Sequence, residues 1–304
     1  MNLRDIEAFV MLADILHFTR AAELLGIGQP QMSQRIRRFE KACGASLVER
    51  TTRTVTLTPA GRAVLPHAQN ALETLHLIKR AATASEDKVI GTVRLGYAGA
   101  SSRPWLPAIA RSVRQESPGI NLQMRSMVYA GAGPGMIVSG DLDICFSRRP
   151  LVHTGLRDEV FEYEQLLVGL PSDHPLAHQP TIDISDLERE PWVSFPAHHG
   201  STVRQAGEEL AAEAGFIPSV VQEAPDSYTI LGLVAAGVGV TITLSSLQHV
   251  STPGLTFVPL AGEPRYMTAT VVWSSQASQA TLEVMDAIKR IRPQLTRPQG
   301  IFLE

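Results

Sequence analysis

The chain has 304 residues, 44% of them hydrophobic, and a formal net charge of −3. This length suits two or three domains, and the hydrophobic content excludes an intrinsically disordered chain. The charge is unevenly placed, because residues 1–90 hold 12 Lys and Arg against 9 Asp and Glu, whereas residues 91–304 hold 15 against 21. A basic first part on an acidic remainder suits a protein with two different partners.

Targeting signals and membrane spans are not visible in the sequence. The first residues carry charge with no apolar run behind them, unlike a signal peptide. No uninterrupted apolar run approaches the roughly twenty residues that span a bilayer, so we expect a cytoplasmic protein. The two cysteines, Cys43 and Cys145, stand among apolar residues, and we expect core thiols without a disulfide.

Residues 1–43 predict three helices, of which the last two form a helix-turn-helix pair. The first helix is predicted over residues 1–16. Its expected buried face consists of Ile6, Phe9, Val10 and Ala13, with Met11 and Leu12 flanking it. Thr19 suits the N-cap of the short second helix. A glycine-containing turn leads into the third helix, where Pro30 suits the first helical turn.

The third predicted helix has an apolar face and a polar face. The apolar stripe consists of Met32, Ile36, Phe39 and Cys43. The polar face, which contains no acid, consists of Pro30, Ser33, Gln34, Arg37, Arg38 and Lys41. Gln and Arg can pair with base edges in the DNA major groove, and Ser and Lys can bind phosphates. On an isolated helix such a face is more often an ordinary solvent-exposed surface. The neighbouring elements therefore decide between a solvent-exposed face and a DNA-binding face.

Two short β-prone runs follow, at residues 47–50 and 54–57. They predict a small hairpin with Arg50 and Arg53 near its tip. Such a wing would hold a DNA phosphate backbone. The wing and the preceding helix pair favour the DNA-binding interpretation of the polar face.

These motifs, in this order and spacing, resemble the DNA-binding domain of LysR-type transcriptional regulators. The matching positions are Phe9, Phe18, Thr19, Ala21, Ala22, Gln29, Pro30, Ser33, residues 36–40 and residues 57–61. Val48 stands where the family usually has Phe, which we interpret as a packing change. The DNA-binding residues implied by the resemblance and by the polar face are Thr19, Gln29, Pro30, Gln31, Ser33, Gln34, Arg37, Arg38, Arg50 and Arg53.

A long helix is predicted from Thr58, a good N-cap, with Pro59 at its first position. Its apolar seam consists of Leu65, Ala68, Leu72 and Leu75. A helix with such a seam and no globular neighbour usually pairs with a second copy, although it could also be a core helix of one domain. We expect a dimerisation linker that ends in a hinge at residues 83–88.

From Val89 onward, strands and helices alternate, which predicts an α/β architecture of parallel sheets with helices on both faces. The expected strands cover residues 93–97, 120–124, 142–146, 164–170, 220–221, 238–243 and 268–273. The expected helices cover residues 103–115, 136–140, 201–214, 228–236 and 279–291. The length of this part suits two lobes with a cleft between them.

In LysR-type regulators the second lobe of a periplasmic-binding-protein-like effector domain is inserted in the first. The resemblance to that family, carried here by residues 140–143, 173–177 and 233–240, implies the domain boundaries. They are a winged helix-turn-helix domain (1–58), a linker helix and hinge (59–89), and an effector domain (90–304) with lobe one at 90–163 and 267–304 and lobe two at 164–266.

Residues 146–150, 192–196 and 221–225 further resemble the branch of this family that responds to benzoate, catechol or muconate and controls the degradation of aromatic compounds. That branch binds a small organic acid between the lobes. The effector-binding positions implied here are Ala100, Ser101, Ser102, Val128, Arg148, Phe195, Pro196 and Glu223. Ala100 and Val128 stand where the family has hydroxyls, which favours an aromatic monoacid over a diacid.

Arg148 directly follows a predicted buried strand, where ligands of open α/β sheets bind, although it could equally form a surface salt bridge. The glycines of residues 131–135 match no nucleotide-binding motif, so a turn that caps the next helix is the simpler interpretation. The histidine pairs at 174 and 178 and at 198 and 199 lack metal-ligand spacing and partners, and no nucleophile elbow is present. We expect no metal, no cofactor and no enzymatic activity.

The combined prediction is a homodimeric or homotetrameric regulator that binds promoter operator DNA and contacts RNA polymerase. A small acid between the lobes would change the arrangement of the bodies, and with it the spacing of the heads and the DNA bend. The alternative is a two-lobed solute-binding or enzymatic protein with an incidental helical head. The polar face of residues 29–38, together with Arg50 and Arg53, favours the regulator, because an enzyme has no use for it.

Overall fold

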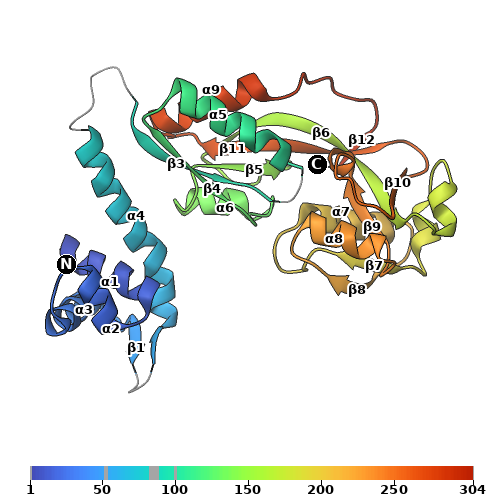
Figure 1. The fold of residues 1–304 in the computed structure, drawn as a ribbon. Helices are drawn as coiled ribbons and strands as arrows, with labels where there is room; N and C mark the ends of the chain where they lie inside the picture. Colours follow the sequence, from blue (N-terminus) through green and yellow to red (C-terminus); the bar gives the residue numbers. More distant parts are fainter. Residues whose placement is uncertain (1, 51–53, 82–88, 99–100, 304) are drawn as a thin grey trace. The chain divides into compact units, whose positions relative to one another are not determined.

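The computed structural model describes residues 2–50, 54–81, 89–98 and 101–303. The chain divides into two compact units, a head of residues 1–90 and a body of residues 91–304 (Figure 1). Within the described ranges, no helix combines the length and the apolar character that crossing a membrane requires.

The head is helical with a small hairpin. Its elements are α1 (Leu3–Ile15), α2 (Phe18–Leu24), α3 (Gln29–Cys43), β1 (Val48–Arg50), β2 (Val55–Leu57) and α4 (Pro59–Ala81). The apolar stripe predicted for α3 is confirmed, because Met32, Ile36 and Phe39 are at most 3% exposed and Cys43 is half-buried. The stripe packs on α1 and α2, which leaves the opposite side of α3 free of the core.

Two details of the helix predictions need correction. In α1, Phe9 is fully buried and Ile6 and Val10 pack partly buried against the core, as predicted, but Ala8 and Leu12 are also fully buried and Ala13 is only half-buried. Both α3 and α4 cover α1, and its buried arc lies between them. The N-cap of α2 is His17, whose Nδ1 accepts a hydrogen bond from the Arg20 N–H at 3.3 Å. Thr19 lies exposed inside α2, because the helix already begins at the buried Phe18.

The start of α4 is fixed tightly to the hairpin. Thr58 Oγ1 accepts a hydrogen bond from the Gly61 N–H at 2.9 Å and donates one to the Ser46 carbonyl at 2.8 Å, which confirms the predicted N-cap. A Cβ atom at Gly61 would lie 2.0 Å from the Leu47 carbonyl oxygen, so only glycine fits this position. The predicted hinge at residues 83–88 lies outside the described residues.

The body is built on a mixed sheet with strand order β10-β6-β11-β5-β3-β4. Its strands are β3 (Gly91–Gly96), β4 (Ile120–Arg125), β5 (Ile144–Arg148), β6 (Leu156–Pro171), β9 (Thr241–Leu244), β10 (Leu255–Pro259), β11 (Arg265–Ser274) and β12 (Ile301–Leu303). A separate pair consists of β7 (Pro191–Ser194) and β8 (Ser219–Glu223). The helices are α5 (Leu106–Glu116), α6 (Gly133–Val138), α7 (Thr202–Glu213), α8 (Ser227–Ala235) and α9 (Gln279–Ile291). Short 3-10 turns are η1 (Arg103–Trp105), η2 (Pro175–His178), η3 (Ile184–Leu187) and η4 (Ser245–Leu247).

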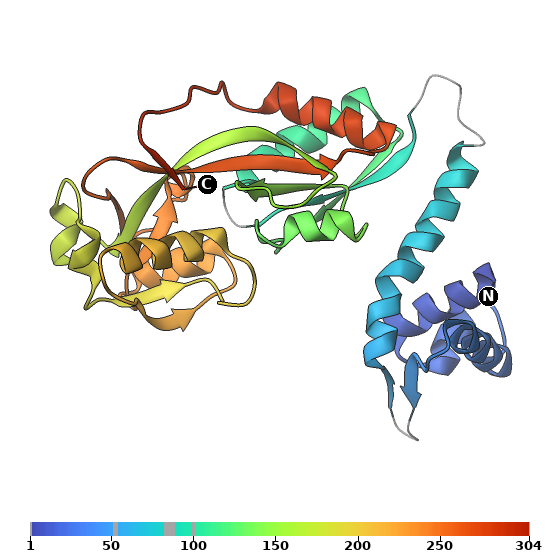
Figure 2. The ribbon, with the colours of Figure 1, turned by 180° about the vertical axis from the view of Figure 1, so that it is seen from behind.

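The body has two lobes joined by two long strands. The first lobe contains β3, β4, β5, α5, α6 and α9, and the second contains β7 to β10, α7 and α8. Strand β6 leads from the first lobe to the second, and β11 returns. In the first lobe, α5 and α9 cover one face of the sheet and α6 lies on the other (Figure 2). The prediction of all-parallel sheets is wrong in part, because β6 and β11 run antiparallel to each other and β11 runs antiparallel to β5.

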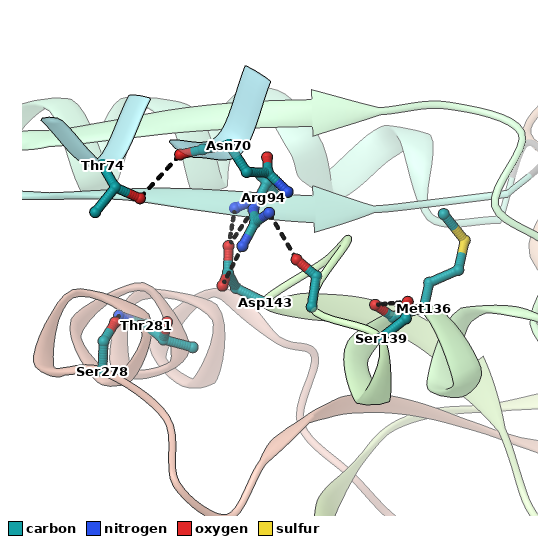
Figure 3. A network of polar contacts seen from close by, with 9 residues as sticks. Asn70, Thr74, Arg94, Met136, Ser139, Asp143, Ser278 and Thr281 are labelled. Carbon is teal, nitrogen blue, oxygen red and sulfur yellow. Dashed lines mark hydrogen bonds and ion pairs between the residues drawn. The ribbon is translucent and has the colours of Figure 1, made fainter. Parts of the chain in front are cut away.

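A buried-edge ion pair fastens the strands of the first lobe. Asp143 accepts hydrogen bonds from Arg94 Nε at 2.9 Å and Nη2 at 3.1 Å, while Arg94 Nη1 donates to the Gly140 carbonyl at 2.7 Å (Figure 3). These bonds tie β3 to the segment that leads into β5, at the end of β5 opposite to Arg148. Nearby, burial raises the pKa of the Cys145 thiol to about 12, which agrees with an unreactive core thiol.

Candidate DNA-binding surface and effector cavity

The polar face of α3 is accessible along the whole helix. Of the residues predicted to contact DNA, Gln29, Pro30, Gln31, Gln34, Arg37 and Arg38 are exposed and Ser33 is half-buried. The first turn of α3 contains no acidic residue and begins at Gly28 without a side-chain cap. Its N-terminal N–H groups and its amide and guanidinium side chains therefore form one surface of hydrogen-bond donors, which suits DNA phosphates and base edges.

Arg38 has a partner inside the head. Its Nη2 lies 3.0 Å from Oδ1 of Asp5, a residue of α1 whose side chain is only 2% exposed. The guanidinium thus compensates a buried carboxylate, and only part of its donor capacity is available to DNA. A substitution of Arg38 would therefore disturb this ion pair as well as DNA binding, so a substitution of Arg37 tests DNA contact more directly.

The hairpin is held by the end of α3. Oε1 of Glu40 accepts hydrogen bonds from the Leu47 N–H at 2.9 Å and the Val48 N–H at 3.2 Å, which positions the start of β1. Arg50 is the last residue of β1, so it stands at the tip side of the hairpin, as predicted. Its side chain and the whole of Arg53 lie outside the described residues.

A cavity lies between the two lobes of the body. It encloses about 540 Å³ of space, its open mouth included. The first lobe contributes Ala98, Ser101, Tyr129, Ala130 and Arg148. The second lobe contributes Phe195, Ser201, Thr202, Val203, Ser227, Ile230, Leu231, Thr241, Ile242, Thr243, Leu244 and Leu247. The second lobe thus supplies most of the apolar wall and most of the hydroxyls.

Arg148 reaches this cavity, but its charge is already compensated. Its Nε and Nη2 donate to Oε2 of Glu164 at 3.0 Å and 2.6 Å, and the two side chains are 10% and 1% exposed. Ser246 donates to the other oxygen of Glu164. Nη2 also lies 3.4 Å from Ser101 Oγ, while no acceptor among the described residues is bonded to Nη1. A ligand can therefore gain a bond from Nη1 without meeting a full positive charge.

A second, smaller cavity of about 360 Å³, its mouth included, continues from the first. The two share Ala98, Ser101, Ala130 and Arg148. The second is further lined by Ser102, Phe146, Ser147, Phe161, Glu162, Glu164 and Ala269. Burial, and to a lesser extent Glu164, raise the pKa of Glu162 to about 7, although Arg148 opposes the shift.

Tyr129 connects the lobes beside the cavity. Its hydroxyl donates to the Pro225 carbonyl at 2.6 Å, and its ring lies edge-on to Phe195 with centroids 6.1 Å apart. The Gly131 N–H donates to the Gly200 carbonyl at 3.1 Å. The glycines of residues 131–135 thus serve a lobe contact and the start of α6, in agreement with a turn and not a phosphate cradle.

The predicted effector positions do not all meet at the cavity. Ser101, Arg148 and Phe195 line it, and Ser102 lines the second cavity. Val128 is 4% exposed and belongs to the core of the first lobe, and Pro196 is absent from the lining of both cavities among the described residues. Glu223 does not line the cavity either, and its carboxylate pairs with Arg204 at 2.5 Å. Ala100 lies outside the described residues.

The hydroxyls of the second lobe and the acidic pair of β6, Glu162 and Glu164, were not predicted from the sequence. Ser201 is the N-cap of α7, so a search for N-cap residues could have found it. Ser227 follows Asp226, the N-cap of α8, and such a search would have found it only as a neighbour. No local pattern points to Glu162 and Glu164, because their burial depends on β5, β11 and η4, which are distant in the chain.

Comparison with known proteins agrees with this arrangement. Residues 3–62 match the bacterial regulatory helix-turn-helix protein, lysR family, and residues 86–291 match the LysR substrate binding domain. The HTH-type transcriptional regulator ShiR of Corynebacterium glutamicum is 34% identical over 273 residues, which are 90% of this chain and 92% of that protein. AlsR of Bacillus subtilis, another HTH-type transcriptional regulator, is 32% identical over 84% of this chain and 85% of its own length.

The fold has a counterpart in a DNA complex. The full-length structure of CbnR complexed with its target DNA has a TM-score of 0.75 at 21% identity and covers 95% of this chain and 99% of that one. That likeness concerns the fold, while the two family models together span the head and most of the body. The chain therefore belongs to the LysR family of DNA-binding transcriptional regulators and is not an enzyme.

Proposed function

We propose that the cavity between the lobes binds a small aromatic acid, and that binding changes how a homo-oligomer holds its heads on an operator. The observation that carries this proposal is the lining of the cavity, which combines an apolar wall with the hydroxyls of Ser201, Thr202 and Ser227 and with the guanidinium of Arg148. Such a site suits a ligand with an apolar body and one anionic head.

The apolar wall favours a planar, aromatic body. Tyr129 and Phe195 contribute rings from the two lobes, and Ile230, Leu231 and Leu247 contribute aliphatic side chains. Aromatic rings meet such walls with dispersion contacts over their whole face. A flexible aliphatic acid would lose more conformational entropy for a similar buried area.

The donor end lies in the second lobe, at the starts of α7 and α8. Ser201 caps α7 and Thr202 begins it, while Ser227 begins α8. The first-turn N–H groups of a helix have no acceptor within it and carry the positive end of its dipole. The start of α7 offers such groups, whereas at α8 the carboxylate of Asp226 already accepts from the Thr229 N–H at 3.1 Å, so α7 is the main anion site. Thr202 Oγ1 is buried and has no hydrogen-bond partner among the described residues. We assign the ligand carboxylate to this end, with Arg148 Nη1 as an additional donor toward the middle of the ligand.

The head supports the DNA part of the proposal. The polar face of α3 contains no acid, and Arg38 with its contact to Asp5 is the member tied to the rest of the head. Helix-turn-helix proteins usually read paired half-sites. The seam of α4 offers a pairing surface, because Leu65, Leu72 and Leu75 remain only half-buried within a single chain. A dimer through α4, joined to a second dimer through the bodies, would bring heads onto neighbouring half-sites.

The proposal is tested with the full chain and the DNA upstream of its own gene. A thermal-shift comparison of benzoate, benzamide, muconate and hexanoate should show the largest rise in melting temperature with benzoate, because only bound ligand stabilises the folded state. Benzoate should also change the affinity for the upstream DNA or the bend in it. An equal response to the uncharged benzamide would contradict an anion site, and the absence of any response to acids would contradict the proposal as a whole.

A further inference from the structure

The second cavity owes its lining to an irregularity in β6. The pairing of β6 with β11 shifts register at Ala269 and Thr270, where Phe161 is the extra residue of β6. In a regular strand, neighbouring side chains point to opposite faces, so Phe161 and Glu162 could not share a cavity. A bulge re-aims one of them. Both therefore line the second cavity, with Glu164 two residues further along the same strand.

The hydrogen-bonding groups of this cavity are mainly acceptors. Ser102 already donates its proton to the Ala98 carbonyl at 3.1 Å, and Ser147 donates to the Ala130 carbonyl at 2.7 Å. Glu164 is engaged by Arg148 and Ser246. Glu162, by contrast, has no hydrogen-bond donor among the described residues, although it is part of the wall. The carboxylate of Glu162 is thus the strong acceptor that is left for a ligand.

One donor stands at the junction of the two cavities. Arg148 lines both of them, its side chain is nine-tenths buried, and no acceptor among the described residues is bonded to its Nη1. A ligand group that passes this junction therefore meets a donor first and an acceptor beyond it. A hydroxyl group satisfies both, because it can accept from Nη1 and donate to Glu162.

We propose that the effector is an acid with a hydroxyl group at the end opposite its carboxylate, and that Glu162 is the residue that selects this hydroxyl. The inference rests on the proposed function, since it places the carboxylate of the same ligand at the starts of α7 and α8. Glu162 binds the ligand directly through its carboxylate. Phe146 and Phe161, whose ring centroids lie 5.2 Å apart, provide the apolar wall around the hydroxyl.

Other groups fit this end less well. A second carboxylate would lie beside Glu162 and Glu164, with one guanidinium that Glu164 already compensates. An ammonium group could not accept from Arg148 Nη1. The raised pKa of Glu162, about 7, agrees with an acid that lacks a partner when no ligand is bound. The titratable groups that face it are Glu164 of β6 and Arg148 of β5, whereas β11 presents Ala269.

The test is calorimetric titration of the full chain with benzoate, 3-hydroxybenzoate and 4-hydroxybenzoate. One hydroxybenzoate should bind at least about tenfold more tightly than benzoate, as expected for a hydrogen bond to a charged group. Its advantage should be larger at pH 8 than at pH 6, because Glu162 accepts best when it is ionised. In Glu162→Gln and Glu162→Leu the advantage should fall below about threefold and lose its pH dependence, while benzoate binds as in the parent.

Controls separate this inference from the proposed function. Glu188→Gln removes the same charge from an exposed position outside both cavities and should leave the preference unchanged. Melting temperatures establish that the variants are folded, and Glu162→Gln, which preserves the side-chain shape, is sufficient should the leucine variant fail. If the parent shows no preference for a hydroxybenzoate over benzoate, or if Glu162→Gln keeps that preference, the role of Glu162 is wrong although the acid site remains supported. If none of the three acids binds, both the proposed function and this inference are wrong.

Discussion

The head and the body hold their functional groups in different ways. In the head, the polar face belongs to one helix, α3, and an apolar core lies directly behind it. In the body, the cavity takes its wall from strands, helix starts and loops that are far apart in the chain. Arg37, Arg38 and Lys41 of α3 lie at the surface, whereas Arg148 and Glu164 of the body are 10% and 1% exposed. Substitutions on the head should therefore act individually, and substitutions in the body should act through partners.

The largest expected effect tests whether the head works as part of a pair. Leu72→Asp places a charge in the seam of α4, and we expect loss of the oligomer and of operator binding, because a charge in a paired seam has no compensating partner. Light scattering and a gel shift measure the two losses. Gln69→Asp, at an exposed position of the same helix, should change neither, and an intact Leu72→Asp oligomer would show that the seam lies elsewhere.

The buried pair of the body provides the sharpest contrast with the head. Arg148→Met leaves the Glu164 carboxylate buried without its cation and should destabilise the body by about 3–5 kcal/mol. The double variant Arg148→Met with Glu164→Met should recover most of this loss, since two apolar groups replace the pair. Urea unfolding measures both. Equal stability of the single and the double variant would contradict the coupling between Arg148 and Glu164. Because loss of Arg148 alone is expected to destabilise the body, Arg148→Ala cannot by itself measure the contribution of Arg148 to ligand binding.

On the head, single substitutions should alter DNA binding without altering stability. Arg37→Ala should weaken operator binding by about 1–3 kcal/mol, as for loss of one base contact, and change the free energy of unfolding by less than about 0.5 kcal/mol.

Arg50→Ala and Arg53→Ala should weaken binding to all DNA sequences alike, and each should lower the slope of DNA affinity against salt concentration by about one. Fluorescence anisotropy at several salt concentrations decides, and an unchanged salt slope in both wing variants would remove the wing from the interface.

The smallest expected effect concerns pH. The folded protein holds the Glu162 proton up to a pKa of about 7, whereas the ordinary value is 4.5. Between these values the folded state binds more protons than the unfolded chain, so the contribution of Glu162 to stability falls as pH rises through this window. Glu162→Gln should therefore gain stability relative to the parent as pH rises from about 5 to about 8. Thermal unfolding of both proteins at each pH measures the difference. A difference that stays constant across this range would contradict the raised pKa.

The same contrast explains which features a sequence can reveal. The stripe of α3 and the cap at Thr58 depend on neighbours within a few residues, and both were predictable from spacing and residue type. The helix at residues 279–291 was predictable for the same reason, and the structure gives α9 these bounds. The buried arc of α1 was predictable only in part, because its centre at Ala8 and Leu12 depends on how α3 and α4 together cover the helix.

The cavity depends on contacts that spacing cannot encode. Arg148 was predictable as a residue at the end of a buried strand, but its partner Glu164 lies on β6 and is held in turn by Ser246 of η4. Val128 was expected in the site by resemblance, yet its side chain packs into the core with Ile137 and Leu142. The bulge at Phe161, which turns Glu162 into the second cavity, leaves no mark in the residue pattern.

Coupling between the effector cavity and DNA binding can be measured directly by following ligand and DNA together. Labelled DNA from upstream of the gene is titrated with the full chain by fluorescence anisotropy, with and without saturating hydroxybenzoate, for the parent and for Ser101→Trp, whose side chain should fill the junction of the two cavities. We expect that the acid changes the DNA affinity of the parent and that Ser101→Trp still binds DNA but no longer responds to the acid. An acid response that persists undiminished in Ser101→Trp would contradict the assignment of the effector to this cavity.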